Sequence, residues 1–447
     1  MKQTRKNIAN LYPYLGLFLL LAGGLAAFFL LPYSIWGDGS IRFQFMDSLV
    51  HDLRIDPMRY SMIGPLFSIP LWWISALFSN PVAVIERYNF LLFAAGLVIL
   101  YRWLKDRYDR KFLLTFGLLL SFGSMIPNHL TSYYGEVFSA VFMTLGTAGI
   151  VTGRSRPGWI FLILAVLNTP ALMIPFALVV GYLTWESRQL RYLSLIPICL
   201  VLMVGESFLR TGSLLAGFQT YLAQDHGYQT VLPYSGRTGY SYPFGLGILS
   251  ILFSFGKGIF LFCPGLLLVV WALKSISNPS ERRLLTLWLL IVLGLILAYA
   301  PWWAWYGGWF WGPRFFLFAS VPASWMLAKL FHSENKSLPM ILVLLILISG
   351  SLWVGVDGVV FQQKMLETCT ANNYALESLC WYVPEFSPLI RPWITHATLS
   401  LNDRLSLILF GVIWFYLIAP VSIDLLSRLK SFYSSFRSRG YLSNWKL

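Results

Sequence analysis

The sequence has little charge: only 12% of its 447 residues are Asp, Glu, Lys or Arg, whereas 57% are hydrophobic. This balance excludes an ordinary water-soluble protein, because the apolar residues occur in long blocks. A helix needs about 17–25 apolar residues to cross a bilayer, and lipid offers no hydrogen bonds to a backbone that is not helical. The sequence therefore predicts an all-α fold, a polytopic membrane helix bundle that forms one integral domain over residues 1–447.

Acidic residues are scarce relative to basic ones, 19 against 33, which gives a net charge of +14. The Lys and Arg residues stand mostly in short loops, where they set the orientation of membrane spans. The positive charge therefore indicates membrane topology and membrane lipids as partners, and it does not indicate a nucleic-acid partner.

Cysteine is also rare, with four residues in the chain. Cys199 and Cys263 lie in apolar runs, where we expect them to be inert packing residues. Cys369 and Cys380 share one polar loop, and they form a disulfide if that loop faces an oxidising compartment. No pair of His, Cys or carboxylate residues has the spacing of a dependable metal site, so neither a metal nor another cofactor is predicted.

The charge pattern predicts the topology. Residues 11–31 read as a retained first span, because no small-residue cleavage site follows them, and the basic residues before it place the N-terminus inside. The basic loop 105–111 then falls inside only if residues 64–79, which contain two prolines, lie along the membrane without crossing it. With this choice, twelve spans leave both termini in the cytoplasm of a multi-pass inner (plasma) membrane protein: 11–31, 86–104, 112–126, 137–152, 158–169, 171–184, 192–209, 258–273, 284–300, the stretch after 314 to about 330, 338–356 and 405–425.

Three longer polar segments fall on the extracytoplasmic side: a first loop at 32–85, a loop from 210 to about 255, and a late loop at 357–404. Residues 40–53 of the first loop show helical periodicity, which predicts an amphipathic helix on the membrane surface. Its apolar face is Ile41, Phe45, Leu49 and Leu53.

Asp38 lies between two glycines directly after the first span, where the membrane ends and water begins. Charges at a membrane boundary are costly and usually serve a function, so Asp38 is the candidate general base of an extracytoplasmic active site. The alternative is that Asp38 caps the helix that follows it, a position that Asp favours.

Other polar residues are predicted on the same side. Arg42 and Arg59 are candidates for binding a lipid-linked phosphate, or else they contact lipid headgroups at the interface. Glu136, at the start of a span, is a candidate second acid that orients an acceptor, or else it serves the helix dipole. His129 and Tyr134, from the same stretch, complete this substrate-binding set, although His129 is also typical of an ordinary interface histidine.

Lys257 and Arg314 are cations at the outer membrane edge, against the usual preference for the inner side. Lys257 stands between two glycines, and Arg314 follows the densest tryptophan cluster in the chain. Both are candidates for an anion site, and an Arg there can grip a phosphate with two hydrogen bonds. For Lys257 the alternative is that the side chain snorkels to the interface.

The chain resembles the GT-C superfamily of integral membrane glycosyltransferases, and most of all its bacterial members. The resemblance covers about residues 1–330 and is carried by the acid after the first span, the juxtamembrane loop and short motifs: Gly-Asp-Gly (37–39), Arg-Tyr-Ser to Gly-Pro-Leu (59–66), Asn-Thr-Pro (168–170), Gly-Lys-Gly (256–258) and Trp-Gly-Pro-Arg (311–314). It also brings Tyr60 into the substrate-binding set. Two features depart from the superfamily: Gly39 stands where many members carry a second acid, and the outer loops lack the Asp-x-Asp metal pattern, which puts metal dependence in doubt.

The resemblance implies inverting transfer of a sugar from a polyprenyl-phosphate-linked donor to an extracytoplasmic lipid, glycan or protein acceptor, with Asp38 as base. Lys257 and Arg314 are assigned to the donor phosphate from their predicted side and their charge. The alternative function is a transporter or flippase for a lipid-linked or small polar substrate. Such a protein needs polar residues at mid-membrane depth. Glu206 is the main candidate for that role, and it lies near a span end.

Overall fold

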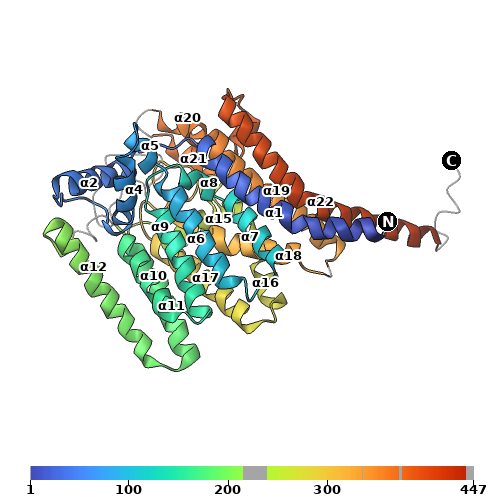
Figure 1. Ribbon diagram of the computed structural model, residues 1–447, viewed down its shortest axis with the longest axis horizontal. Coiled ribbons are helices and arrows are strands. Elements are labelled where there is room, and N and C mark those ends of the chain that lie inside the picture. The colour runs from blue at the N-terminus through green and yellow to red at the C-terminus, as the bar shows by residue number, and fades with distance from the viewer. Residues whose placement is uncertain (1, 215–238, 335, 372–374, 439–447) are drawn as a thin grey trace.

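The computed structural model describes residues 2–214, 239–334, 336–371 and 375–438, and the regular secondary structure of these ranges is helical (Figure 1). Eight helices among them are long and apolar enough to cross a membrane. The all-α class and the helical membrane bundle are thereby confirmed, while the count of twelve spans stays a prediction. The eight segments are Tyr12–Leu30, Pro81–Leu104, Pro170–Ser187, Leu190–Thr211, Pro279–Tyr299, Arg314–Phe331, Leu338–Phe361 and Leu401–Ser431.

The bundle is built from helices whose bounds follow the apolar runs. They are α1 (Lys2–Leu30), α6 (Tyr88–Leu104), α7 (Arg110–Phe122), α9 (Glu136–Val151), α10 (Ser155–Asn168), α11 (Met173–Ser187), α12 (Leu195–Thr211), α14 (Phe244–Phe253), α16 (Val269–Ser275), α17 (Pro279–Tyr299), α18 (Ser320–Phe331), α19 (Leu338–Val356) and α22 (Leu401–Ser438). Short helices connect them: α2 (Asp38–Asp52), α3 (Ile63–Leu66), α4 (Ile69–Ser75), α5 (Pro81–Ile85), α8 (Ile126–Leu130), α15 (Ile259–Phe262), α20 (Glu367–Thr370) and α21 (Glu377–Tyr382).

Two helices form the centre of the bundle. Nearly every residue of α7 and of α9 is buried. A helix that is apolar all round must be covered on all sides, and α9 packs against α6, α10 and α17. The first and last helices, α1 and α22, run side by side at the edge of the bundle (Figure 1), where the rings of Tyr12 and Tyr416 stack 4.3 Å apart.

The helix predicted at 40–53 is present as α2, but its buried face differs from the predicted one. Gly39, Arg42, Phe45 and Met46 are buried, whereas Leu53 is 86% exposed. Of the expected apolar stripe, Phe45 is buried and Leu49 packs against the same cluster, but Ile41 is 38% exposed and Leu53 lies beyond the end of α2. The stripe was therefore right only in part, because α2 packs against α3 and α4 with the face that also carries Arg42. Residues 64–79 contain α3 and α4, which are both far too short to cross a membrane.

Two of the predicted outer loops contain helical structure. The loop predicted from 210 to about 255 is wrong at its end, because residues 244–253 form α14; residues 215–238 lie outside the described ranges. Gly247 lets α14 approach the chain after α17 so closely that an added Cβ would lie 1.9 Å from the carbonyl oxygen of Ala300.

In the late loop, a disulfide joins Cys369 in α20 to Cys380 in α21, which answers the pairing question left open by the sequence.

Candidate active site

A cavity of about 1230 Å³, counting its open mouth, lies where the first loop meets the bundle. Six parts of the chain line it: the first loop, the first half of α9, the end of α10 with the turn after it, the second half of α12, the end of α17, and the beginning of the segment that starts at Arg314. Its polar residues include Asp38, Arg42, Arg59, Tyr60, Ser61, Glu136, Ser139, Asn168, Thr169, Glu206, Ser207, Arg210 and Arg314. The structure therefore brings together Asp38, Arg42, Arg59, Tyr60, Glu136 and Arg314 from the predicted set.

Asp38 is placed by the turn before it. Gly37 has φ 55°, a region that favours glycine, and an added Cβ would lie 2.5 Å from the hydroxyl oxygen of Tyr134. The Asp38 carboxylate accepts a hydrogen bond from the Tyr60 hydroxyl (2.7 Å) and another from Nη1 of Arg314 (2.9 Å). Its partners are thus side chains from other parts of the sequence. A residue that only capped the following helix would not need these partners.

The charge of Asp38 is set by two opposing effects. Burial raises the pKa of Asp38, but the Arg314 and Arg42 guanidinium groups and the Tyr60 hydrogen bond together hold that pKa below its ordinary value. Asp38 is therefore ionised at neutral pH, and in this state its carboxylate only accepts hydrogen bonds.

Arg314 links two acids. The tight turn before it includes Gly312 at φ 66°. Its Nη1 lies 2.9 Å from Asp38 and 3.7 Å from Glu136. The guanidinium also lies over the Tyr134 ring, 5.4 Å from its centroid, and its Nε has no hydrogen-bond partner among the described residues. Tyr134 therefore contacts the site through Arg314 and does not itself line the cavity.

Arg42 is a buried cation whose charge helps to lower the pKa of Asp38, although the two side chains form no direct ion pair. Its exposure is 7%, and Nη1 donates to the carbonyl oxygen of Ser61 and to Oδ1 of Asn168, both at 3.4 Å. Its Nε has no hydrogen-bond partner, and no ion pair joins Arg42 to another described residue. A buried charge is costly unless it is paired, so this position suits the binding of an anion.

Lys257 and His129 lie away from the cavity lining. Lys257 is buried, and its ammonium donates to the carbonyl oxygens of Gly308 (3.3 Å), Phe310 and Gly312 (3.0 Å), which fixes the loop just before Arg314. His129 is buried as well, and burial lowers its pKa to about 3, so the ring is neutral. Both residues serve the packing around the site.

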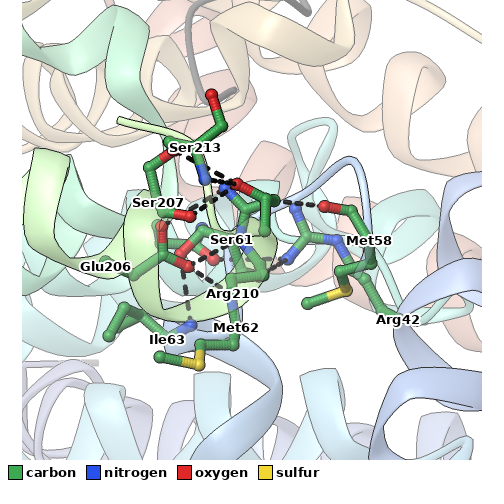
Figure 2. A network of polar contacts seen from close by, with 11 residues as sticks. Arg42, Met58, Ser61, Met62, Ile63, Glu206, Ser207, Arg210 and Ser213 are labelled. Atoms are coloured by element: carbon green, nitrogen blue, oxygen red, sulfur yellow. Dashed lines mark hydrogen bonds and ion pairs between the residues drawn. The ribbon is translucent and has the colours of Figure 1, made fainter. Parts of the chain in front are cut away.

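Glu206 and Arg210 join the site from α12, and sequence reasoning did not assign them to it. Arg210 Nε lies 3.0 Å from Glu206 Oε1, and both side chains are almost fully buried. Figure 2 shows this pair beside the Met58–Ile63 segment. Arg210 donates to the carbonyl oxygen of Met58, and Glu206 accepts from the backbone N–H of Met62 (2.9 Å). The pair thus brackets the five-residue segment 58–62 that carries Tyr60.

A sequence signal for this pair exists. Opposite charges four residues apart lie on one helix face, and inside an apolar segment such a pair indicates a specific role. The segment that the pair holds is more than 140 residues away, and no local pattern predicts that contact. Asn168 belongs to the Asn-Thr-Pro motif, but it was given no role in the site. Its Nδ2 donates to the carbonyl oxygen of Gly135 (2.9 Å) and to Ser139 Oγ (2.8 Å), which ties the end of α10 to the start of α9.

Within the described residues, no group of three or more His, Cys, Asp or Glu side chains is placed to hold a metal ion, and metal dependence is a question for experiment. A scan of the chain against protein-family models, a search of curated proteins and a search of solved structures found no significant match.

Proposed function

We propose that this chain is a GT-C-type membrane glycosyltransferase that moves a sugar from a polyprenyl-phosphate-linked donor to a hydroxyl group of an extracytoplasmic lipid, glycan or protein. Its setting is the plasma membrane, with both termini in the cytoplasm and the cavity facing outward. The observation that carries the proposal is that one cavity holds an ionised carboxylate, Asp38, its ion-pair partner Arg314, whose side chain is 14% exposed, and a second, buried arginine, Arg42. A base and an anion site side by side are the two parts that such a transfer needs.

The chemistry divides between these parts. An acceptor hydroxyl is weakly nucleophilic, so Asp38 takes its proton as the oxygen bonds to the anomeric carbon, which contributes about 10²–10⁴-fold. The bond from that carbon to the donor phosphate breaks, and its electron pair leaves with the phosphate. Arg42 and Arg314 stabilise this negative charge from fixed positions in a site that excludes much of the water. Attack from the face opposite the leaving group inverts the anomeric configuration.

The Asp38–Arg314 ion pair determines the order in which the donor binds and the acceptor is activated. While Arg314 holds Asp38, the carboxylate is a weak base, because its pKa is lowered. A donor phosphate competes with Asp38 for the Arg314 guanidinium. When the phosphate displaces Asp38 as the partner of the Arg314 guanidinium, the Asp38 pKa rises and the carboxylate becomes a better base, so donor binding precedes acceptor activation.

The cavity also has an apolar side for the lipid part of the donor. Met143 of α9, Met203 of α12 and Leu295 of α17 contribute to it. Several neighbouring α12 side chains are exposed, such as Val201 at 70%, as expected for a helix that faces lipid. We assign the donor chain to this side, and we assign Lys257 to holding the loop before Arg314 in place of the phosphate role expected from the sequence.

The test compares envelope glycans and glycolipids by mass spectrometry in a host strain that lacks the gene and in the same strain carrying wild type, Asp38→Asn or Asp47→Asn. Asp47 is the matched control, because it lies on the same helix, its side chain is 56% exposed, and among the described residues its ion-pair partner is His51. We expect a hexose- or pentose-sized mass loss in the deletion strain that wild type and Asp47→Asn restore and Asp38→Asn does not. Full rescue by Asp38→Asn would refute the role of Asp38. An unchanged glycan profile together with substrate uptake in proteoliposomes would favour the transporter.

A further inference from the structure

Two apolar hollows adjoin on the outside of the bundle, between α1 and α6 and over α7. Their volumes are about 1370 Å³ and 1120 Å³, counting their open sides. They share four lining residues, Leu20, Leu21, Leu97 and Val98, and we therefore treat them as one continuous groove. No residue of this groove lines the Asp38 cavity.

The groove has the length of a lipid chain. On α1 it extends from Leu17 to Leu31, a rise of about 21 Å at 1.5 Å per residue. The hydrocarbon core of a bilayer is about 30 Å thick, so the groove is longer than one leaflet. Its rims are apolar and open, with Leu21 64% and Leu25 62% exposed. In a membrane these surfaces must be covered by hydrocarbon.

The two ends of the groove differ in charge. The half near the outer ends of the helices is apolar, whereas Arg102, Lys105 and Arg110 line the other half at its inner end. Arg110 lies over the ring of Tyr14, with 5.2 Å between the guanidinium carbon and the ring centroid. None of the described residues that line the groove is Asp or Glu. A long apolar channel that ends in three cations is complementary to a lipid with a negatively charged headgroup.

We propose that this groove binds one anionic phospholipid of the inner leaflet, with its acyl chains along α1 and α6 and its phosphate among Arg102, Lys105 and Arg110. Basic residues in inner loops also serve orientation, and that role needs no groove. What distinguishes the site is that the three cations line the same end of one continuous apolar groove. The inference is independent of the enzymatic proposal.

Native mass spectrometry of the full chain, released from micelles that contain equal amounts of phosphatidylglycerol and phosphatidylcholine, tests the charge. Each Lys or Arg near an anionic surface contributes roughly fivefold in affinity, so three give at most about 100-fold. We expect the wild type to retain phosphatidylglycerol at least about tenfold over phosphatidylcholine, a preference that is lost when the groove cations are replaced (Arg102→Gln, Lys105→Gln, Arg110→Gln). The control replaces three exposed cations that do not line the groove and keeps the preference (Arg156→Gln, Arg191→Gln, Lys274→Gln).

A second pair of variants tests the groove itself. An added Cβ at Gly24, which lines the groove, meets no atom within 4 Å, and the same is true of Gly181 on α11. Gly24→Trp should therefore fill the groove without disturbing the fold and reduce the retention of both lipids, whereas Gly181→Trp should retain them. Equal retention of the two lipids by the wild type would overturn the proposal. So would an equal loss in the charge control, or unchanged retention in Gly24→Trp.

Discussion

The hydrogen bond from Tyr60 to Asp38 offers the sharpest test of the site. Tyr60→Phe removes the hydroxyl that lies 2.7 Å from the carboxylate and keeps the ring that lies 5.2 Å from the Arg42 guanidinium. A hydrogen bond to a charged group contributes about 1.5–3 kcal/mol, and one pKa unit corresponds to about 1.4 kcal/mol. The loss of this bond therefore raises the pKa of Asp38. Because the side chain is 28% exposed and water replaces part of the lost bond, we expect a free-energy change at the lower end of that range.

The direction of the pKa change follows from which form of Asp38 the hydroxyl stabilises. The Tyr60 hydroxyl stabilises the carboxylate, so its loss makes Asp38 easier to protonate and moves the acid limb of the pH–rate profile towards higher pH. The assay is kcat/KM for sugar transfer in proteoliposomes as a function of pH, which reports the base of the free enzyme. The control is Tyr33→Phe, which removes a hydroxyl that donates to the carbonyl oxygen of Ala27 at 3.2 Å. An acid limb that stays at the wild-type pH in Tyr60→Phe would refute the assignment of Asp38 as base.

Further predictions concern the surroundings of the site. Glu206→Gln leaves Arg210 buried without its counter-ion and should lower the free energy of unfolding by about 3–5 kcal/mol. Replacing both Glu206 and Arg210 with Met should restore the melting temperature but not the transfer activity. Wild-type activity in this double variant would show that the hold of the pair on residues 58–62 is dispensable. Since burial lowers the pKa of His129 to about 3, stability should fall by up to about 1.4 kcal/mol per pH unit as pH drops from about 6.5 towards 3. His129→Asn should flatten that slope in melting curves, and an unchanged slope would place the acid sensitivity elsewhere. Replacing Cys369 and Cys380, 11 residues apart, with Ser should destabilise the late loop by about 3 kcal/mol and speed hydrogen exchange in α21, and unaltered exchange would contradict this.

The class of this protein follows from its composition. Long apolar blocks and scarce charge require membrane helices, because these properties depend only on neighbours along the chain. The same local logic singled out Asp38 and Arg314 as charges at a membrane edge. It treated Lys257 and Arg314 alike, since each is a cation predicted at an outer span end. The structure separates them: Lys257 is surrounded by carbonyl oxygens, and Arg314 lies against a carboxylate.

Only the tertiary structure decided which polar residues meet. Asp38 and Arg314 are 276 positions apart, and their contact depends on the path of every helix between them. Arg42 lies off the apolar stripe of its helix, yet it is buried, because the packing of α2 selects a face that periodicity does not predict. The sequence indicates the charge pair on α12 by its spacing, but it does not predict that this pair binds the segment that carries Tyr60. Periodicity and charge act over a few residues, whereas the site is set by packing between segments that are remote in sequence.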